Sequence, residues 1–163
     1  MSTTSGISYD DLNSPVWSPD GSLVAFTALM TGTQDDWRVF VIRADGTGLR
    51  PLSDHRDGLS EANPAWSPDG LQIALQRWVN DSAGNVDVRP VTVVRVADGH
   101  EVEVGSVHNN GYDSFGWSPD GLSILELPGD DVKQVEVVPV TAGTPTKPAW
   151  PVFSALSWQR TAD

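Results

Sequence analysis

The chain has 163 residues, which is enough for one domain with a core of its own. Its 22 acidic residues outnumber 10 basic ones and give a net charge of −12. This balance disfavours nucleic acid or an anionic membrane as a partner, because phosphate contact requires a basic face. The chain has no cysteine, which excludes disulfides and thiol catalysis, and no apolar stretch long enough to span a membrane.

A five-residue phrase, Trp-Ser-Pro-Asp-Gly, occurs three times without change. The copies begin at Trp17, Trp66 and Trp117, which are 49 and 51 residues apart, and a degenerate fourth copy keeps only Trp158. Proline presets a turn, aspartate bonds back to the backbone and glycine accepts a positive φ, so the phrase predicts a tight hairpin. A period of roughly 40–50 residues is typical of a β-propeller blade. We assign a structural role to the repeated tryptophans and turn residues: Trp17, Pro19, Asp20, Gly21, Trp66, Pro68, Asp69, Gly70, Trp117, Pro119, Asp120, Gly121 and Trp158.

The stretches between these turns follow the same order in each repeat. An apolar run follows each hairpin: 23–26, 73–75 and 124–125. A β-branched run comes after a variable loop: 39–42, 91–94 and 135–138. A glycine-containing turn and a more polar edge stretch, such as 49–52 or 101–104, close the repeat. We therefore predict an all-β fold of propeller blades, each with four antiparallel strands. A single domain, 1–163, would contain three repeats and a terminal strand, at about 13–53, 62–105, 113–149 and 154–158.

The pattern Pro-x-Trp-Ser-Pro-Asp-Gly, an apolar strand, then an aliphatic strand closed by Asp-Gly, resembles the TolB-like, or WD-type-like, β-propeller repeat over essentially the whole chain. The resemblance implies four-stranded blades around an axis, a role in protein–protein interaction, and a periplasmic or extracellular bacterial location, although residues 1–10 contain no export signal. Similar propellers cap the active site of prolyl-oligopeptidase-type peptidases. The chain departs from the family in having three full repeats, where such propellers usually have about six or seven.

Three blades are too few to close a propeller, which needs about four or more. The repeat tryptophans are expected between blades, so an open arc would leave apolar blade faces in water. Two solutions remain open. Two chains could close a six-bladed ring, each donating Ser154–Trp158 to the first blade of the other, or further blades could come from another or a longer polypeptide.

We find no catalytic motif in the sequence. The hydrolase elbow Gly-x-Ser-x-Gly, the metalloprotease motif His-Glu-x-x-His, the P-loop and the dinucleotide fingerprint are all absent. The serines at 18, 67 and 118 and the Asp-Gly pairs recur with the repeat, so we interpret them as turn residues rather than as nucleophiles or calcium ligands. We expect a non-enzymatic protein with no cofactor and no metal.

The loops opposite the Asp-Gly turns are rich in acidic residues. One interpretation is that this acidic loop face keeps a small β protein in solution, and the other is that it binds a basic protein or peptide. Glu61 is also expected on this face. The candidate partner-binding residues are Asp10, Asp35, Asp36, His55, Asp81, His108, Tyr112, Asp130 and Asp131.

These observations favour a non-enzymatic protein–protein interaction or scaffold module that binds a protein or peptide through the acidic loop face and self-associates, as a dimer that completes a ring. The alternatives are a fragment or accessory propeller of a prolyl-oligopeptidase-type peptidase, and a propeller that binds a cation or a carbohydrate.

Overall fold

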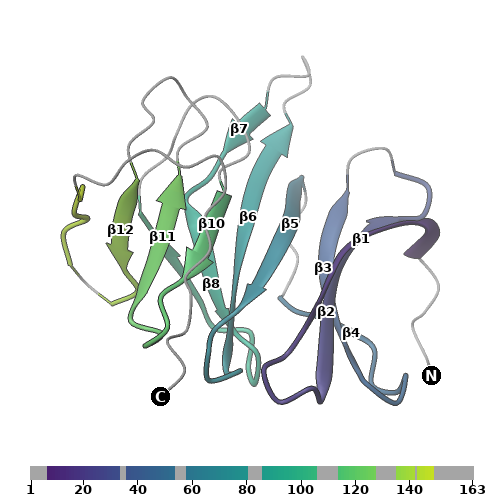
Figure 1. Cartoon of the computed structure of the whole chain (residues 1–163). Coiled ribbons are helices and arrows are strands. Elements are labelled where there is room, and N and C mark those ends of the chain that lie inside the picture. Colours follow the sequence, from purple (N-terminus) through teal and green to yellow (C-terminus); the bar gives the residue numbers. More distant parts are fainter. Residues whose placement is uncertain are drawn as a thin grey trace.

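A computed structural model of the chain describes residues 7–33, 36–53, 58–80, 86–105, 114–127, 135–141 and 143–148, except the side chains of 8–11. The regular elements in these ranges are all strands, so the all-β prediction is confirmed. No helix in the described part is long and apolar enough to cross a membrane. The strands form three antiparallel sheets that follow one another in chain order across the molecule (Figure 1). We call these sheets blades 1, 2 and 3.

The strands of each blade pair with their neighbours in sequence order, apart from one extra strand in blade 2. Blade 1 consists of β1 (Ile7–Trp17), β2 (Leu23–Met30), β3 (Trp37–Arg43) and β4 (Arg50–Pro51). Blade 2 consists of β5 (Leu59–Trp66), β6 (Gln72–Asn80), β8 (Val91–Arg95) and β9 (Glu101–Val104), with β7 (Val86–Val88) paired to the end of β6. Blade 3 consists of β10 (Ser114–Trp117), β11 (Ser123–Leu127) and β12 (Glu136–Pro139).

Two positions in these blades bear on the sequence expectations. In blade 3, Thr146 forms a bridge to Val137, where a fourth strand would run. In blade 1, the innermost position is filled by β1, where we expected the strand 154–158 of a second copy. The sheet of blade 1 therefore has four strands without one from a second copy.

The repeated phrase folds into the same turn in each blade. In the first copy, the Ser18 hydroxyl donates to Asp20 Oδ1 at 2.6 Å, the same oxygen accepts the Ser22 N–H at 3.0 Å, and the Gly21 N–H donates to the Ser18 carbonyl at 2.9 Å. Corresponding bonds recur at Asp69 and Asp120. These bonds stabilise the ionised carboxylate, so the pKa of each of the three aspartates is lowered, that of Asp20 to about 2.

The hairpin after each tryptophan has one register throughout. Trp17 pairs with Val24, Trp66 with Ile73 and Trp117 with Ile124. Corresponding residues of the three blades can therefore be compared directly.

A bulge interrupts the innermost strand in blades 1 and 2. It lies at Ser14 and Asn63, which have φ of 54° and 55°, and each of these residues precedes a proline that cannot donate to the ladder. Blade 3 has Phe115 in place of that proline, and its hairpin is regular. The loss of the proline thus coincides with the loss of the bulge.

The core consists mainly of layers between successive blades. Ala25, Val39 and Val41 of blade 1 pack against Ile73 and Leu75 of blade 2. A second layer joins blade 2 to blade 3: Ala74, Val91, Val93 and Val104 pack with Trp117, Ile124 and Val138. Because side chains alternate along a strand, each blade has a front face toward the following blade and a back face toward the preceding one.

The three turn aspartates should link stability to acid pH. Their pKa is lower in the folded chain, so their contribution is complete above the unfolded value of about 4 and is lost as the pH falls toward the folded value. We expect the triple variant Asp20→Asn, Asp69→Asn, Asp120→Asn to lose less thermal stability than the wild type between pH about 4 and about 2.

Thermal melting followed by circular dichroism measures this difference, and Asp87→Asn, an exposed aspartate outside the turns, serves as the control. Parallel pH profiles for the triple variant and the wild type would contradict the assignment.

Candidate functional site

Asp36 is the one candidate partner-binding residue whose side chain lies in the described part of the chain. Its carboxylate accepts hydrogen bonds from Arg38 Nη2 at 2.8 Å and Nε at 3.0 Å, and both side chains are about one quarter exposed. Arg38 therefore neutralises this acid locally. For Asp10 only the backbone is described, in β1. The remaining candidates, and the repeat residue Trp158, lie outside the described residues: Asp35, His55, Asp81, His108, Tyr112, Asp130 and Asp131.

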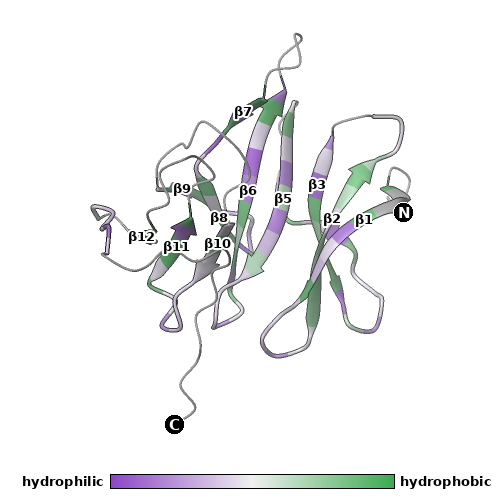
Figure 2. Cartoon of the chain, turned by 45° about the horizontal axis from the view of Figure 1, so that its top comes forward, coloured by the Kyte–Doolittle hydropathy of each residue, from purple (hydrophilic) through white to green (hydrophobic). Residues whose placement is uncertain are grey.

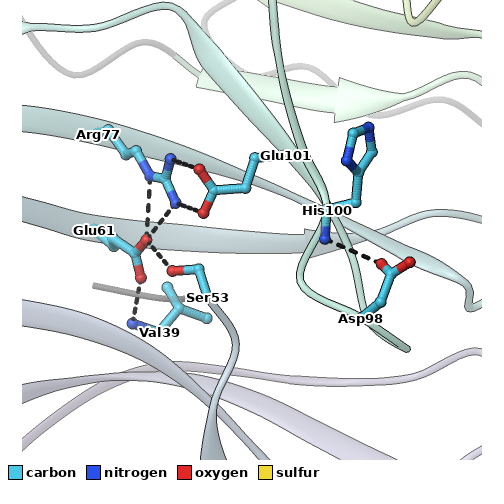
Figure 3. Close-up of polar contacts among 7 residues, drawn as sticks. All are labelled: Val39, Ser53, Glu61, Arg77, Asp98, His100 and Glu101. Atoms are coloured by element: carbon cyan, nitrogen blue, oxygen red, sulfur yellow. Dashed lines mark hydrogen bonds and ion pairs between the residues drawn. The ribbon is translucent and has the colours of Figure 1, made fainter. Parts of the chain in front are cut away.

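Glu61 belongs to the joint between blades 1 and 2, which corrects its expected place on the exposed loop face. It lies on β5 and is 2% exposed. One carboxylate oxygen, Oε1, accepts the Ser53 hydroxyl of blade 1 at 2.7 Å, and the other, Oε2, accepts the Val39 N–H at 3.2 Å. The carboxylate thus ties blade 2 to two groups of blade 1 (Figure 3).

Arg77 supplies the charge that lets this carboxylate stay buried. Its Nη2 lies 2.7 Å from Glu61 Oε1, and its guanidinium makes two bonds of 2.7 Å to Glu101 on β9. Burial alone would lower the pKa of Arg77, but the hydrogen bonds and charges of Glu101 and Glu61 outweigh burial and raise it. A paired, hydrogen-bonded charge of this kind is costly to break by removing one partner.

The sequence held a signal for this network that we did not use. Arg77 interrupts an otherwise largely apolar strand, and a charge in a buried strand requires a partner. The hairpin register, corrected for the bulge before Trp66, places Glu61 directly opposite it. The sequence does not predict this bulge, and in a regular hairpin Glu61 would not lie opposite Arg77.

The joints between blades repeat one hydrogen bond. The indole Nε1–H of Trp66 donates to the Val16 carbonyl of blade 1 at 3.1 Å, and that of Trp117 donates to the Ala65 carbonyl of blade 2 at 2.9 Å. In each case the acceptor residue directly precedes the tryptophan of the preceding blade. Trp117 is 7% exposed and Trp66 is half-buried, so both rings lie between blades.

The turn glycines and prolines make a second repeated contact. A Cβ added to Gly70 would lie 3.5 Å from Pro19 Cδ, and one added to Gly121 would lie 3.6 Å from Pro68 Cδ. The glycine of each turn therefore lies against the proline of the preceding turn. Gly21 has no atom within 4 Å of such a Cβ among the residues described.

On the back face of blade 1, no described residue covers Trp17 in the way that the preceding blades cover Trp66 and Trp117. Trp17 is 62% exposed and Leu12 45%, and Val24 and Phe26 are half-buried, whereas their counterparts in blade 2, Ile73 and Leu75, are completely buried. We call Leu12, Trp17, Gly21, Val24 and Phe26 the open face. Figure 2 shows β2 mostly in the hydrophobic colour, while β5 and β6 carry hydrophilic stretches.

Apolar residues stand on the back face of blade 1 where blade 2 has the ion pair. Leu12 and Ala28 face each other across β1 and β2 at the positions of Glu61 and Arg77. Phe26 stacks on Phe40, with ring centroids 5.9 Å apart. The surface that covers the open face therefore needs no charge there.

Blade 3 carries two glutamates on its back face. Glu126 and Glu136 are direct cross-strand neighbours, 1% and 5% exposed, and Glu136 pairs with Lys147 at 2.7 Å. The Glu126 carboxylate lies against Gly105 of blade 2, where an added Cβ would be 2.6 Å from it. The structure describes no group of three or more potential metal ligands in its resolved ranges.

Comparisons with known proteins bear on the fold. No family model matches the chain. Over 144 residues, 86% of its length, it is 27% identical to a protein of Bacillus subtilis named "Uncharacterized peptidase YuxL", of which it spans 21%.

Among solved structures, an oligogalacturonate lyase in complex with manganese superposes with a TM-score of 0.65 at 22% identity, over 88% of this chain and 39% of the lyase. A putative TolB from Agrobacterium tumefaciens superposes with a TM-score of 0.58 at 20% identity, over 86% of this chain and 46% of that one. These likenesses support a β-propeller fold, and the chain corresponds to less than half of each of these proteins.

Removing the indole of a filled joint should cost far more than removing that of the open face. We expect Trp117→Ala to lower the free energy of unfolding by about 3–5 kcal/mol, because the ring is buried and hydrogen-bonded. Trp17→Ala should change it by less than about 1 kcal/mol, since most of its ring is already in water. Urea unfolding at low protein concentration measures both, and a loss for Trp117→Ala as small as that expected for Trp17→Ala would show that Trp117 is not a joint residue.

Stability should tolerate replacement of Glu61 and Arg77 together better than replacement of Arg77 alone. Arg77→Ala should cost about 3–5 kcal/mol, because it leaves Glu61 buried without a cation. The double variant Glu61→Leu, Arg77→Ala should recover most of that loss, because it reproduces the Leu12 and Ala28 pair of blade 1. A double-mutant cycle with Glu61→Leu alone isolates the coupling, and additive losses would rule out the pairing as the source of the cost.

Proposed function

We propose that the chain is a non-enzymatic β-propeller module whose task is to bind other protein, and that the open face of blade 1 is its main docking surface. One observation carries this proposal: Trp17 is 62% exposed where its two counterparts are covered by a preceding blade. Exposed apolar residues grouped on one face are typical of sites of protein association.

The use of charge in the described residues supports a binding role over a catalytic one. The turn aspartates serve the hairpins, and Glu61, Arg77 and Glu101 serve the joint between blades 1 and 2. In these ranges, no histidine, serine and acid come together as a catalytic set would require. Among the described residues, these charged groups stabilise the hairpins and the contact between blades 1 and 2.

The acidic loop face is a second proposed surface, suited to a basic protein segment. The net charge of −12 favours such a partner through long-range attraction. Asp36 contributes little to it, because Arg38 pairs with its carboxylate.

The alternative function is a propeller portion of a peptidase, favoured by the relationship to the Bacillus subtilis protein named as a peptidase. In that case a hydrolase domain supplies the catalysis, and the open face of blade 1 packs on further blades of the same polypeptide. A coding sequence that continues into further repeats and a hydrolase domain would favour this function over the first.

Photo-crosslinking in cells that produce the chain tests the docking surface. With Trp17 replaced by p-benzoylphenylalanine, irradiation should give one protein adduct of defined mass, because the probe then lies in a joint. The matched control carries the same probe at Leu71, which is 64% exposed on the hairpin of blade 2 and outside the open face.

We expect the adduct at position 17 and not at position 71. The absence of any adduct at position 17, in a chain that folds normally by circular dichroism, would contradict the proposed function. The identity of an adduct is read by mass spectrometry.

A further inference from the structure

We infer that the outer edge of blade 2, formed by β9 (Glu101–Val104), is a site where an extended segment of another protein adds a strand to the sheet. The segment alternates basic and apolar residues. This site lies apart from the open face, so it goes beyond the docking surface of the proposed function. The direction of the backbone groups of β9, the prolines at the outer edges of the other two blades and the charges of β9 all point to it.

The backbone of Glu103 faces away from the rest of blade 2. At the start of the ladder between β8 and β9, the Arg95 N–H donates to the His100 carbonyl at 2.8 Å. Hydrogen-bonded and non-hydrogen-bonded pairs alternate along the antiparallel register that continues from this pair. Val102 and Val104 therefore exchange hydrogen bonds with β8, whereas the N–H and the carbonyl of Glu103 point outward. No described strand pairs with β9 on that side.

The outer edges of blades 1 and 3 each have a proline at an outward position. In blade 1, the Leu52 N–H donates to β3 at 2.9 Å, so the residue before it, Pro51, points outward. In blade 3, Thr146 exchanges two hydrogen bonds with Val137, at 2.8 and 3.0 Å, so Pro145 points outward. Proline has no N–H to offer to an added strand, and it therefore protects a sheet edge against further pairing.

The edge of blade 2 lacks this protection. β9 contains no proline, and Glu103 occupies the place that Pro51 has in blade 1, because the registers of the two blades correspond. An outward N–H and carbonyl are what strand addition requires, since main-chain hydrogen bonds provide its affinity. A carboxylate repels an acidic strand and attracts a basic one, whereas proline hinders a strand of any sequence. The edge of blade 2 is thus selective rather than closed.

The two faces of β9 define the chemistry of the partner. Glu103 is exposed and lies on the back face with Glu101, whose carboxylate pairs with Arg77 at 2.7 Å. Val102 is 43% exposed and lies on the front face, opposite Val93. An added strand continues both faces of the sheet, so it places a basic side chain beside Glu103 and an apolar one beside Val102.

A second copy of this chain does not fit the same edge. In an antiparallel pair of two β9 strands, glutamates of one copy would lie beside glutamates of the other, and like charges on adjoining strands are destabilising. The net charge of −12 adds repulsion between copies and attracts a basic segment instead. The occupant is therefore a basic segment of a different protein.

Fluorescence anisotropy with synthetic peptides tests the site on the full chain. The probe is a labelled peptide of sequence Thr-Val-Lys-Val-Lys-Val-Thr, and its matched control has glutamate at both lysine positions. We expect the lysine peptide to bind more than about tenfold more tightly than the glutamate peptide. Glu103→Lys should weaken binding of the lysine peptide by more than about tenfold. Asp87→Lys makes the same change in net charge at an exposed position outside β9, and should leave the dissociation constant within about twofold.

Glu103→Pro tests strand addition itself. It gives β9 the proline that blade 1 has at Pro51, and it removes no hydrogen bond to β8, because the N–H of residue 103 points outward. We expect this variant to bind the lysine peptide more than about tenfold more weakly, with a melting curve by circular dichroism close to that of the wild type. If Glu103→Pro does not fold, the comparison of Glu103→Lys with Asp87→Lys decides the question.

Three results would overturn the inference. Equal binding of the two peptides would remove the charge selection, and unchanged binding to Glu103→Pro would place the peptide elsewhere on the chain, such as the acidic loop face. A dimer in sedimentation velocity that Glu103→Pro abolishes would identify a second copy as the occupant. The crosslink at position 17 does not depend on β9, so the proposed function stands or fails separately.

Discussion

The structure depends on one constraint: a blade is a sheet with two apolar faces, and each face has to be covered by an adjoining surface, which within this chain is a neighbouring blade. The indole hydrogen bond is the directional part of that cover. A tryptophan N–H buried without an acceptor is costly, so the ring settles where the preceding blade presents a carbonyl. Trp66 and Trp117 meet this condition, with donor–acceptor distances of 3.1 and 2.9 Å. The repeated turn fixes the ring position, because it sets the same hairpin register in all three blades.

The apolar layers explain cohesion, and the polar groups distinguish one joint from another. The joint between blades 1 and 2 contains Glu61, Ser53 and Arg77, whereas blade 3 meets blade 2 through Glu126 beside Gly105. A blade with the wrong back face would bury a carboxylate without its matching donors, which costs more than the apolar contact gains. These groups therefore act against incorrect pairing of otherwise similar blades.

Much of the fold could be predicted from the sequence, because a strict turn phrase and apolar runs at blade spacing leave few alternatives to β-hairpins. The observed β2, β6 and β11 cover the apolar runs predicted after each turn. The buried ion pair and the open face were harder to predict from the sequence. The bulges at Ser14 and Asn63 shift the register by an amount that residue type alone does not reveal, so the sequence predicts a loop position for Glu61, whereas the structure has it opposite Arg77. The exposure of Trp17 could be inferred only in general terms, since it depends on which neighbour covers blade 1.

The open face links this fold to the proposed binding role through the same constraint. In blades 2 and 3 the back-face residues Ile73, Leu75 and Ile124 are fully buried, and the cover comes from the preceding blade. On blade 1 the corresponding positions keep large apolar side chains rather than surface polar ones. A face that functioned in water would gain solubility from polar residues at the exposed positions of Leu12 and Trp17. Apolar residues at these two positions, together with the neutral Leu12 and Ala28 pair in place of an ion pair, would suit the further joint that the proposed function requires.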